Sequence, residues 1–116
     1  MKTIMVKDHI ETAFSTDDAN ILKSAIDKVL DENERVILDF TGITIFTSLF
    51  MGSMISKYIQ MLGPEDYKNK IQVWGLSDLG QETYDHSLAF ATEWHQLTDE
   101  EKEKYIKIFT ETMEDT

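Results

Sequence analysis

Residues 35–40, Arg-Val-Ile-Leu-Asp-Phe, restrict the possible folds more than any other stretch of the chain. The run is short, continuously apolar between its polar positions, and rich in side chains that favour strands. Such a run is typical of a strand that is covered on both faces and therefore lies in the centre of a sheet. We expect Val36, Leu38 and Phe40 to point to one face and Ile37 to the other, all nearly inaccessible to solvent.

Strand-like and helix-like segments alternate on either side of this run. We expect strands at residues 3–6 and 69–76, and a helix after Ser15, which has capping-box spacing with Asp18. Its apolar face is predicted to contain Ile21, Leu22, Ala25, Ile26, Val29 and Leu30. Residues 43–46 either extend the central strand or form a connection. Further helices are expected from Thr47 or Ser48 to about Leu62, over residues 79–93, and over residues 98–113.

This order predicts an α/β fold with a mainly parallel sheet of three to four strands, plus a C-terminal helix. We expect one domain over residues 1–116, with a core of residues 1–95 and an amphipathic C-terminal helix at about 98–113. The C-terminal helix is expected to place Tyr105, Ile106, Phe109 and Met113 on one stripe. It packs either on its own domain or on another copy, and the sequence leaves a homodimer open.

The chain is acidic, since 22 Asp and Glu residues against 11 Lys and Arg residues give a net charge of −11. Phosphate binding needs clustered cations, so we expect no direct contact with nucleic acid. There is no cysteine, and no apolar run approaches the roughly 20 residues of a membrane helix. The N-terminus lacks the apolar region of a secretion signal. We therefore expect a cytoplasmic protein that does not enter a membrane.

No motif for catalysis or metal binding is apparent. The three histidines, at positions 9, 86 and 95, lack the spacing of a metal site. The glycines do not form a phosphate-binding loop, and Ser48 is not in a nucleophile elbow. We expect no enzyme, no metal and no cofactor.

Residues 35–59, RVILDFTGITIFTSLFMGSMISKYI, resemble the core of the STAS domain of bacterial anti-sigma-factor antagonists. The similarity is greater to a STAS-like family of uncharacterised function, whose members carry an LDF-(S/T)-G-(I/V) strand followed by S-x-x-F. The resemblance covers roughly residues 17–92. It implies a non-enzymatic regulatory module that binds a protein partner, such as a histidine-kinase-like ATPase or an anti-sigma-type factor. The alternative is an acidic decoy or inhibitor of a basic, nucleic-acid-binding partner.

The same resemblance implies where the partner binds. Anti-sigma-factor antagonists carry D-S-(S/T)-G at the strand–helix junction, and the last hydroxyl is phosphorylated. Here Thr47 falls at the Asp, Ser48 at the first Ser, Leu49 at the phospho-acceptor and Phe50 at the Gly. The acceptor is therefore lost, and Ser48, one residue before that position, could accept phosphate only if the start of the helix shifted.

The expected partner-binding residues are Asp39, Thr41, Phe46, Thr47, Ser48, Leu49 and Phe50. Three of them, Phe46, Leu49 and Phe50, are candidate apolar anchors, each of which could instead belong to the core. A plain helix cap is the alternative role for Ser48. Asp39 and Thr41 could instead hold the turn through side-chain-to-backbone bonds.

Overall fold

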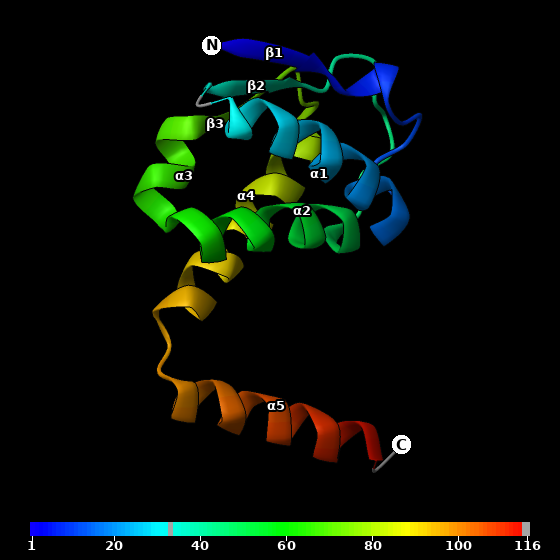
Figure 1. Cartoon of the computed structure of the whole chain (residues 1–116). Helices are drawn as coiled ribbons and strands as arrows, with labels where there is room; N and C mark the ends of the chain where they lie inside the picture. The colour runs from blue at the N-terminus through cyan, green and yellow to red at the C-terminus, as the bar shows by residue number, and fades with distance from the viewer. Residues whose placement is uncertain (33, 115–116) are drawn as a thin grey trace.

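The computed structural model describes residues 1–32 and 34–114, without the side chains of residue 109 and residues 111–114. It is an α/β fold with a three-stranded parallel sheet in the order β1-β2-β3 (Figure 1). The elements are β1 (Lys2–Met5), a 3-10 turn η1 (Val6–Asp8), α1 (Thr16–Asp31), β2 (Val36–Asp39), α2 (Ser48–Leu62), α3 (Pro64–Lys70), β3 (Ile71–Trp74), α4 (Asp78–Gln96) and α5 (Asp99–Glu114). The predicted fold class and the central position of β2 are confirmed.

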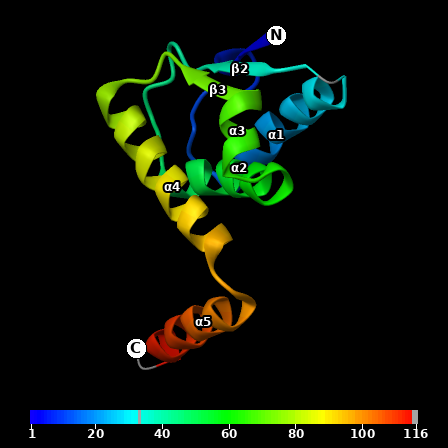
Figure 2. The ribbon, with the colours of Figure 1, turned by 90° about the vertical axis from the view of Figure 1, so that its left-hand side faces the viewer.

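The sheet has one helical layer. Val36, Leu38 and Phe40 are at most 1% exposed and belong to the core, and Ile37 is 6% exposed. Helices α1 to α4 all lie on one side of the sheet in both views (Figures 1 and 2). The expected burial of all four side chains is confirmed, although the described helices lie over one face only (Figures 1 and 2). Ile37 lies on the other face, between Thr3 and Gln72 of the neighbouring strands, and reaches its low exposure without a helix over it.

The first helix follows its sequence signals closely. Ser15 accepts a hydrogen bond from the Asp18 backbone N–H and donates its own N–H to the Asp18 carboxylate, so the predicted capping box is confirmed. Leu22 and Ile26 are fully buried. Ile21, which was predicted to point inward, is 49% exposed. The apolar stripe of α1 is therefore narrower than the sequence indicates.

Two other segments depart from the predicted pattern, and a third settles an open alternative. Pro64–Lys70 forms the short helix α3, which was not predicted. Residues 43–46 form a connection, one of the two predicted alternatives, and their one described pairing is an isolated parallel bridge between Ala13 and Phe46. Strand β3 covers only Ile71–Trp74, the middle of the predicted range.

The C-terminal helix α5 projects away from the rest of the molecule (Figures 1 and 2). It begins after Thr98, whose side chain and backbone exchange hydrogen bonds with Glu101. Tyr105 and Ile106 share the predicted stripe and are 59% and 57% exposed. The side chains of Phe109 and Met113, predicted for the same stripe, lie outside the described residues. Within the described residues, no helix combines the length and the apolar character needed to cross a membrane.

Candidate protein-binding site

The turn after β2 is closed by hydrogen bonds and by a glycine. Asp39 Oδ1 accepts hydrogen bonds from the Thr41 backbone N–H, at 2.9 Å, and from Thr41 Oγ1, at 2.6 Å. These bonds hold the pKa of Asp39 below its ordinary value, with the side-chain bond contributing most. Gly75 packs so tightly here that a Cβ atom would lie 2.5 Å from Thr41 Oγ1. Asp39 and Thr41 therefore shape the turn.

The connection from this turn to α2 is fixed on the segment that precedes α1. The Ala13 N–H donates to the Ile45 carbonyl, and the Ala13 carbonyl accepts from the Thr47 N–H, each at 3.0 Å. The Phe46 ring lies 5.9 Å from the Phe40 ring, centroid to centroid. Phe46 also lies so close to Gly80 that a Cβ atom there would be 2.9 Å from the ring. Phe46 therefore packs against the fold and is not a free anchor.

The start of α2 separates the remaining predicted residues. Thr47 caps the helix, because its side chain accepts from the Phe50 N–H at 3.1 Å. Ser48 is the first helical residue and is exposed, so the alternative of Ser48 as the cap is wrong. Phe50 is fully buried and meets Phe40 edge to face, which excludes it as a surface anchor. Leu49, in contrast, is 61% exposed.

Two further apolar side chains are exposed beside this helix start. Phe14 is 58% exposed and Ile45 is 49% exposed. The exposure of these two side chains follows from the bridge between Ala13 and Phe46, which point inward. Phe14 is the neighbour of Ala13 and Ile45 is the neighbour of Phe46, and neighbouring side chains in extended backbone point to opposite sides. We call Phe14, Ile45 and Leu49 the junction patch. Sequence reasoning missed Phe14 and Ile45, since the bridge that exposes them joins residues 33 positions apart and has no local signature.

A groove of about 640 Å³ lies next to the junction patch, between α2 and α4. We call it the α2–α4 groove. On the α2 side its lining is mostly small, and a Cβ atom at Gly52 would meet nothing within 4 Å. On the α4 side the main apolar residues are Phe90, Ala91 and Trp94, with His86 and His95 beside them. The groove is thus open and carries no acidic side chain.

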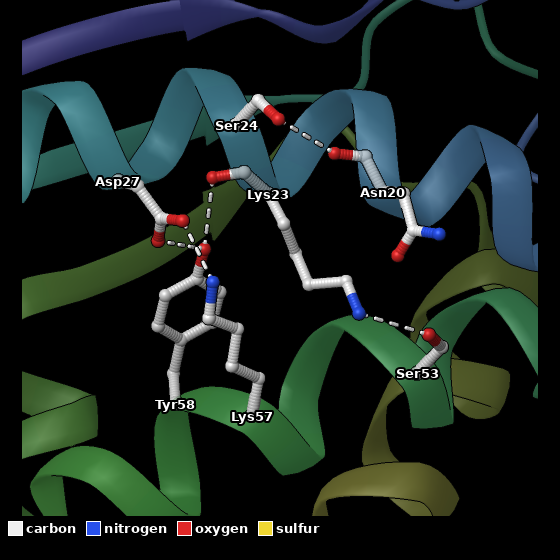
Figure 3. Close-up of polar contacts among 7 residues, drawn as sticks. All are labelled: Asn20, Lys23, Ser24, Asp27, Ser53, Lys57 and Tyr58. Carbon is white, nitrogen blue, oxygen red and sulfur yellow. Dashed lines mark hydrogen bonds and ion pairs between the residues drawn. The ribbon is translucent and has the colours of Figure 1, made fainter.

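Polar contacts with α1 fix the orientation of α2 (Figure 3). Asp27 pairs with Lys57 at 2.7 Å and accepts from the Tyr58 hydroxyl at 2.8 Å. Lys23 Nζ donates to Ser53 Oγ at 3.2 Å. Burial raises the pKa of Tyr58, and the hydrogen bond to Asp27 raises it further. Burial lowers the pKa of Lys23, and the positive charge of Lys57 lowers it further. These contacts hold one flank of α2 on α1, so the side that carries Leu49 and Gly52 is presented in a fixed direction.

No group of three or more His, Asp or Glu side chains suited to a metal ion occurs among the described residues. A family model described as a STAS-like domain of unknown function (DUF4325) matches residues 18–81, more than half of the chain. The chain belongs to this STAS-like family. The match begins in α1 and ends in the first turn of α4, so it includes β2, the junction and α2. No curated protein and no solved structure matches the chain.

Proposed function

We propose that this STAS-like domain is a non-enzymatic regulatory module that binds a protein partner through the junction patch. The observation that carries the proposal is the exposure of Leu49, 61%, next to a fully buried Phe50. Large apolar side chains at the centre of an interface supply most of its binding energy. Interface centres are also depleted of charge, and the patch is uncharged in a chain with a net charge of −11.

The partner class comes from the resemblance to anti-sigma-factor antagonists. Their partners are kinases of the histidine-kinase-like ATPase type, and the equivalent junction is the surface that such a kinase contacts. Here a leucine stands at the position of the phospho-acceptor. An apolar residue in that place favours constitutive docking, because no phosphate group can be added there to introduce about two negative charges.

Capture experiments with matched variants test the proposal. Leu49→Asp places a charge at the second residue of α2, and Leu79→Asp places the same charge at the second residue of α4. The two leucines are similarly exposed, at 61% and 63%. Used as baits in extract of the cells that make the protein, wild type and Leu79→Asp should retain a common partner that Leu49→Asp loses. Equal retention by all three chains would contradict docking at the junction patch.

The absence of a phosphorylation switch is a separate prediction. Incubation with the captured partner and ATP should leave the chain unmodified, because Leu49 has no hydroxyl group. Ser48 is exposed at the start of α2, so the hydroxyl is accessible to a kinase. Intact-mass spectrometry measures the outcome. Stoichiometric phosphate on Ser48 would show that the switch has moved by one residue and was not lost.

A further inference from the structure

Beyond the proposed function, we propose that helix α5 of one copy fills the α2–α4 groove of a second copy. Leu49 lines this groove as well as belonging to the junction patch, so the dimer and the partner of the proposed function share that residue. The exchange is reciprocal, so two chains form a symmetric dimer in which each contributes one helix and one groove. The groove and the helix have matching features, which are taken in turn below.

Helix α5 has an apolar side that its own chain leaves exposed. On this side, Tyr105 and Ile106 are 59% and 57% exposed. Only Leu97 and Thr98 separate α5 from α4, and the helix leads away from the body in both views (Figures 1 and 2). Close to this connection, the Tyr105 ring lies 6.4 Å from the Trp94 ring, centroid to centroid. That contact ties the first half of α5 to the end of its own α4 and leaves the groove along α2 open.

Helix α5 matches in length the helix that forms one wall of the groove, and the floor of the groove is made of small residues. At 1.5 Å per residue, α5 is about 24 Å long and α2 about 22 Å. Ser48, Gly52 and Ser56 follow one another at four-residue steps and so lie on one side of α2. A glycine without a packing reason inside its own domain permits another backbone to approach closely, and Gly52 is such a glycine.

Charge complementarity favours α5 as the occupant. Its first turn carries Asp99, Glu100 and Glu101. The residues that line the α2–α4 groove, by contrast, include no Asp or Glu, and His86 and His95 lie among them. In a chain with 22 acidic residues, a lining without acidic side chains favours the approach of an acidic helix.

The exposed apolar area approaches what a small dimer interface needs. Phe90 is 67% exposed, and Leu49, Tyr105 and Ile106 are each more than half exposed. Aromatic side chains bury about 150–250 Å² in total, so Phe90 and Tyr105 each still offer roughly 100 Å², and the smaller Leu49 and Ile106 somewhat less. Two copies therefore bury roughly 800 Å² from these residues, and the groove floor brings the total towards the roughly 1,000 Å² that a specific interface needs.

The oligomeric state of matched variants tests the helix side of this contact. By sedimentation equilibrium at micromolar concentration, the wild-type chain should be a dimer. Ile106→Glu should weaken the dimer at least tenfold. Lys107→Gln changes the charge by the same one unit at the next position, about 100° around the helix, and should leave the dimer intact. A monomeric wild type at about 100 µM would overturn the proposal, and so would a dimer unaffected by Ile106→Glu.

The groove side is tested by Gly52→Glu, because a Cβ atom at this position meets nothing within 4 Å in the monomer. This variant should also be monomeric, with an unchanged far-ultraviolet circular dichroism spectrum. An equimolar mixture of Ile106→Glu and Gly52→Glu should associate more strongly than either variant alone, because one intact helix then meets one intact groove. A dimeric Gly52→Glu would indicate pairing between α5 helices and overturn the exchange, as would a mixture that associates no more strongly than the separate variants. Ile106 lies outside the junction patch, so Ile106→Glu should lose the dimer and still capture the partner. That result would distinguish this inference from the proposed function.

Discussion

The two sides of α2 differ as much as any two regions of this molecule. The inner side buries Phe50, Met51, Met54, Ile55, Tyr58 and Ile59, each at most 1% exposed. The outer side carries Leu49, which is largely exposed, and Gly52, which has open space around it. The inner residues hold the helix in the hydrophobic core. The outer ones contribute nothing evident to that packing, which indicates that they are available for binding.

The same contrast appears between two glycines. Gly75, at φ +74°, packs directly against the turn formed by Asp39 and Thr41. Gly52 has ordinary helical geometry and an empty neighbourhood. The first glycine is required by the fold, whereas the second is not. Both lie within the STAS-like match, so family membership alone does not separate residues that build the fold from residues free to bind.

The largest expected effect is at the inner side of α2. Phe50→Ala removes a fully buried ring that contacts Phe40, and should lower the free energy of unfolding by about 3–5 kcal/mol. Chemical denaturation measures this value, with Leu49→Ala as the control that should change it by less than about 0.5 kcal/mol. Similar losses for the two variants would remove the distinction between the two sides of the helix.

The next effect is at the closed turn. Gly75→Ala should destabilise the fold by about 2–4 kcal/mol, because its Cβ would overlap Thr41 and Asp39 at a positive φ. Gly63→Ala is the matched control, since Gly63 also has a positive φ, of +81°, but nothing within 4 Å of a Cβ atom. Thermal and chemical unfolding should show a clearly smaller loss for Gly63→Ala. Equal losses would mean that backbone strain, and not close packing on the turn, sets the cost.

At Gly52 the expected effect is smaller and has the opposite sign. Gly52→Ala should raise the free energy of unfolding by about 0.5–1 kcal/mol, because alanine favours the helix and its Cβ meets nothing within 4 Å. The comparison is best made in an Ile106→Glu background, so that association does not contribute. A destabilised Gly52→Ala would show that the groove floor is packed in the monomer.

Local sequence signals predicted much of this fold. The apolar run of residues 35–40 led to the central strand, and the Ser15–Asp18 spacing led to the observed capping box. Helix α3 was missed because its seven residues bury one large side chain, Tyr67, which is too little for a periodic pattern. The choice between Thr47 and Ser48 as the cap could not be made either, since adjacent hydroxyl residues have similar propensities.

The candidate site was predicted only in part, because exposure at the junction depends on tertiary contacts. Leu49 and Phe50 are equally apolar neighbours in the sequence, yet one is exposed and the other fully buried. Phe46, in the connection before α2, packs against Gly80 of α4. Phe14 points outward because its neighbour Ala13 pairs with Phe46, 33 positions away in the sequence. Contacts between residues more than 30 positions apart decide which of these side chains are exposed, and such contacts leave no periodic pattern in the local sequence.

The most direct test of the proposed docking surface is the affinity of Leu49→Asp for the partner captured by the wild-type chain. The aspartate lies at the second residue of α2, where the helix dipole tolerates a negative charge, so the free energy of unfolding should stay within about 0.5 kcal/mol of wild type. A charge in the centre of an apolar interface should weaken binding by about 2 kcal/mol or more, roughly 30-fold. Unchanged affinity in a stably folded Leu49→Asp, or unfolding caused by this substitution, would contradict the account.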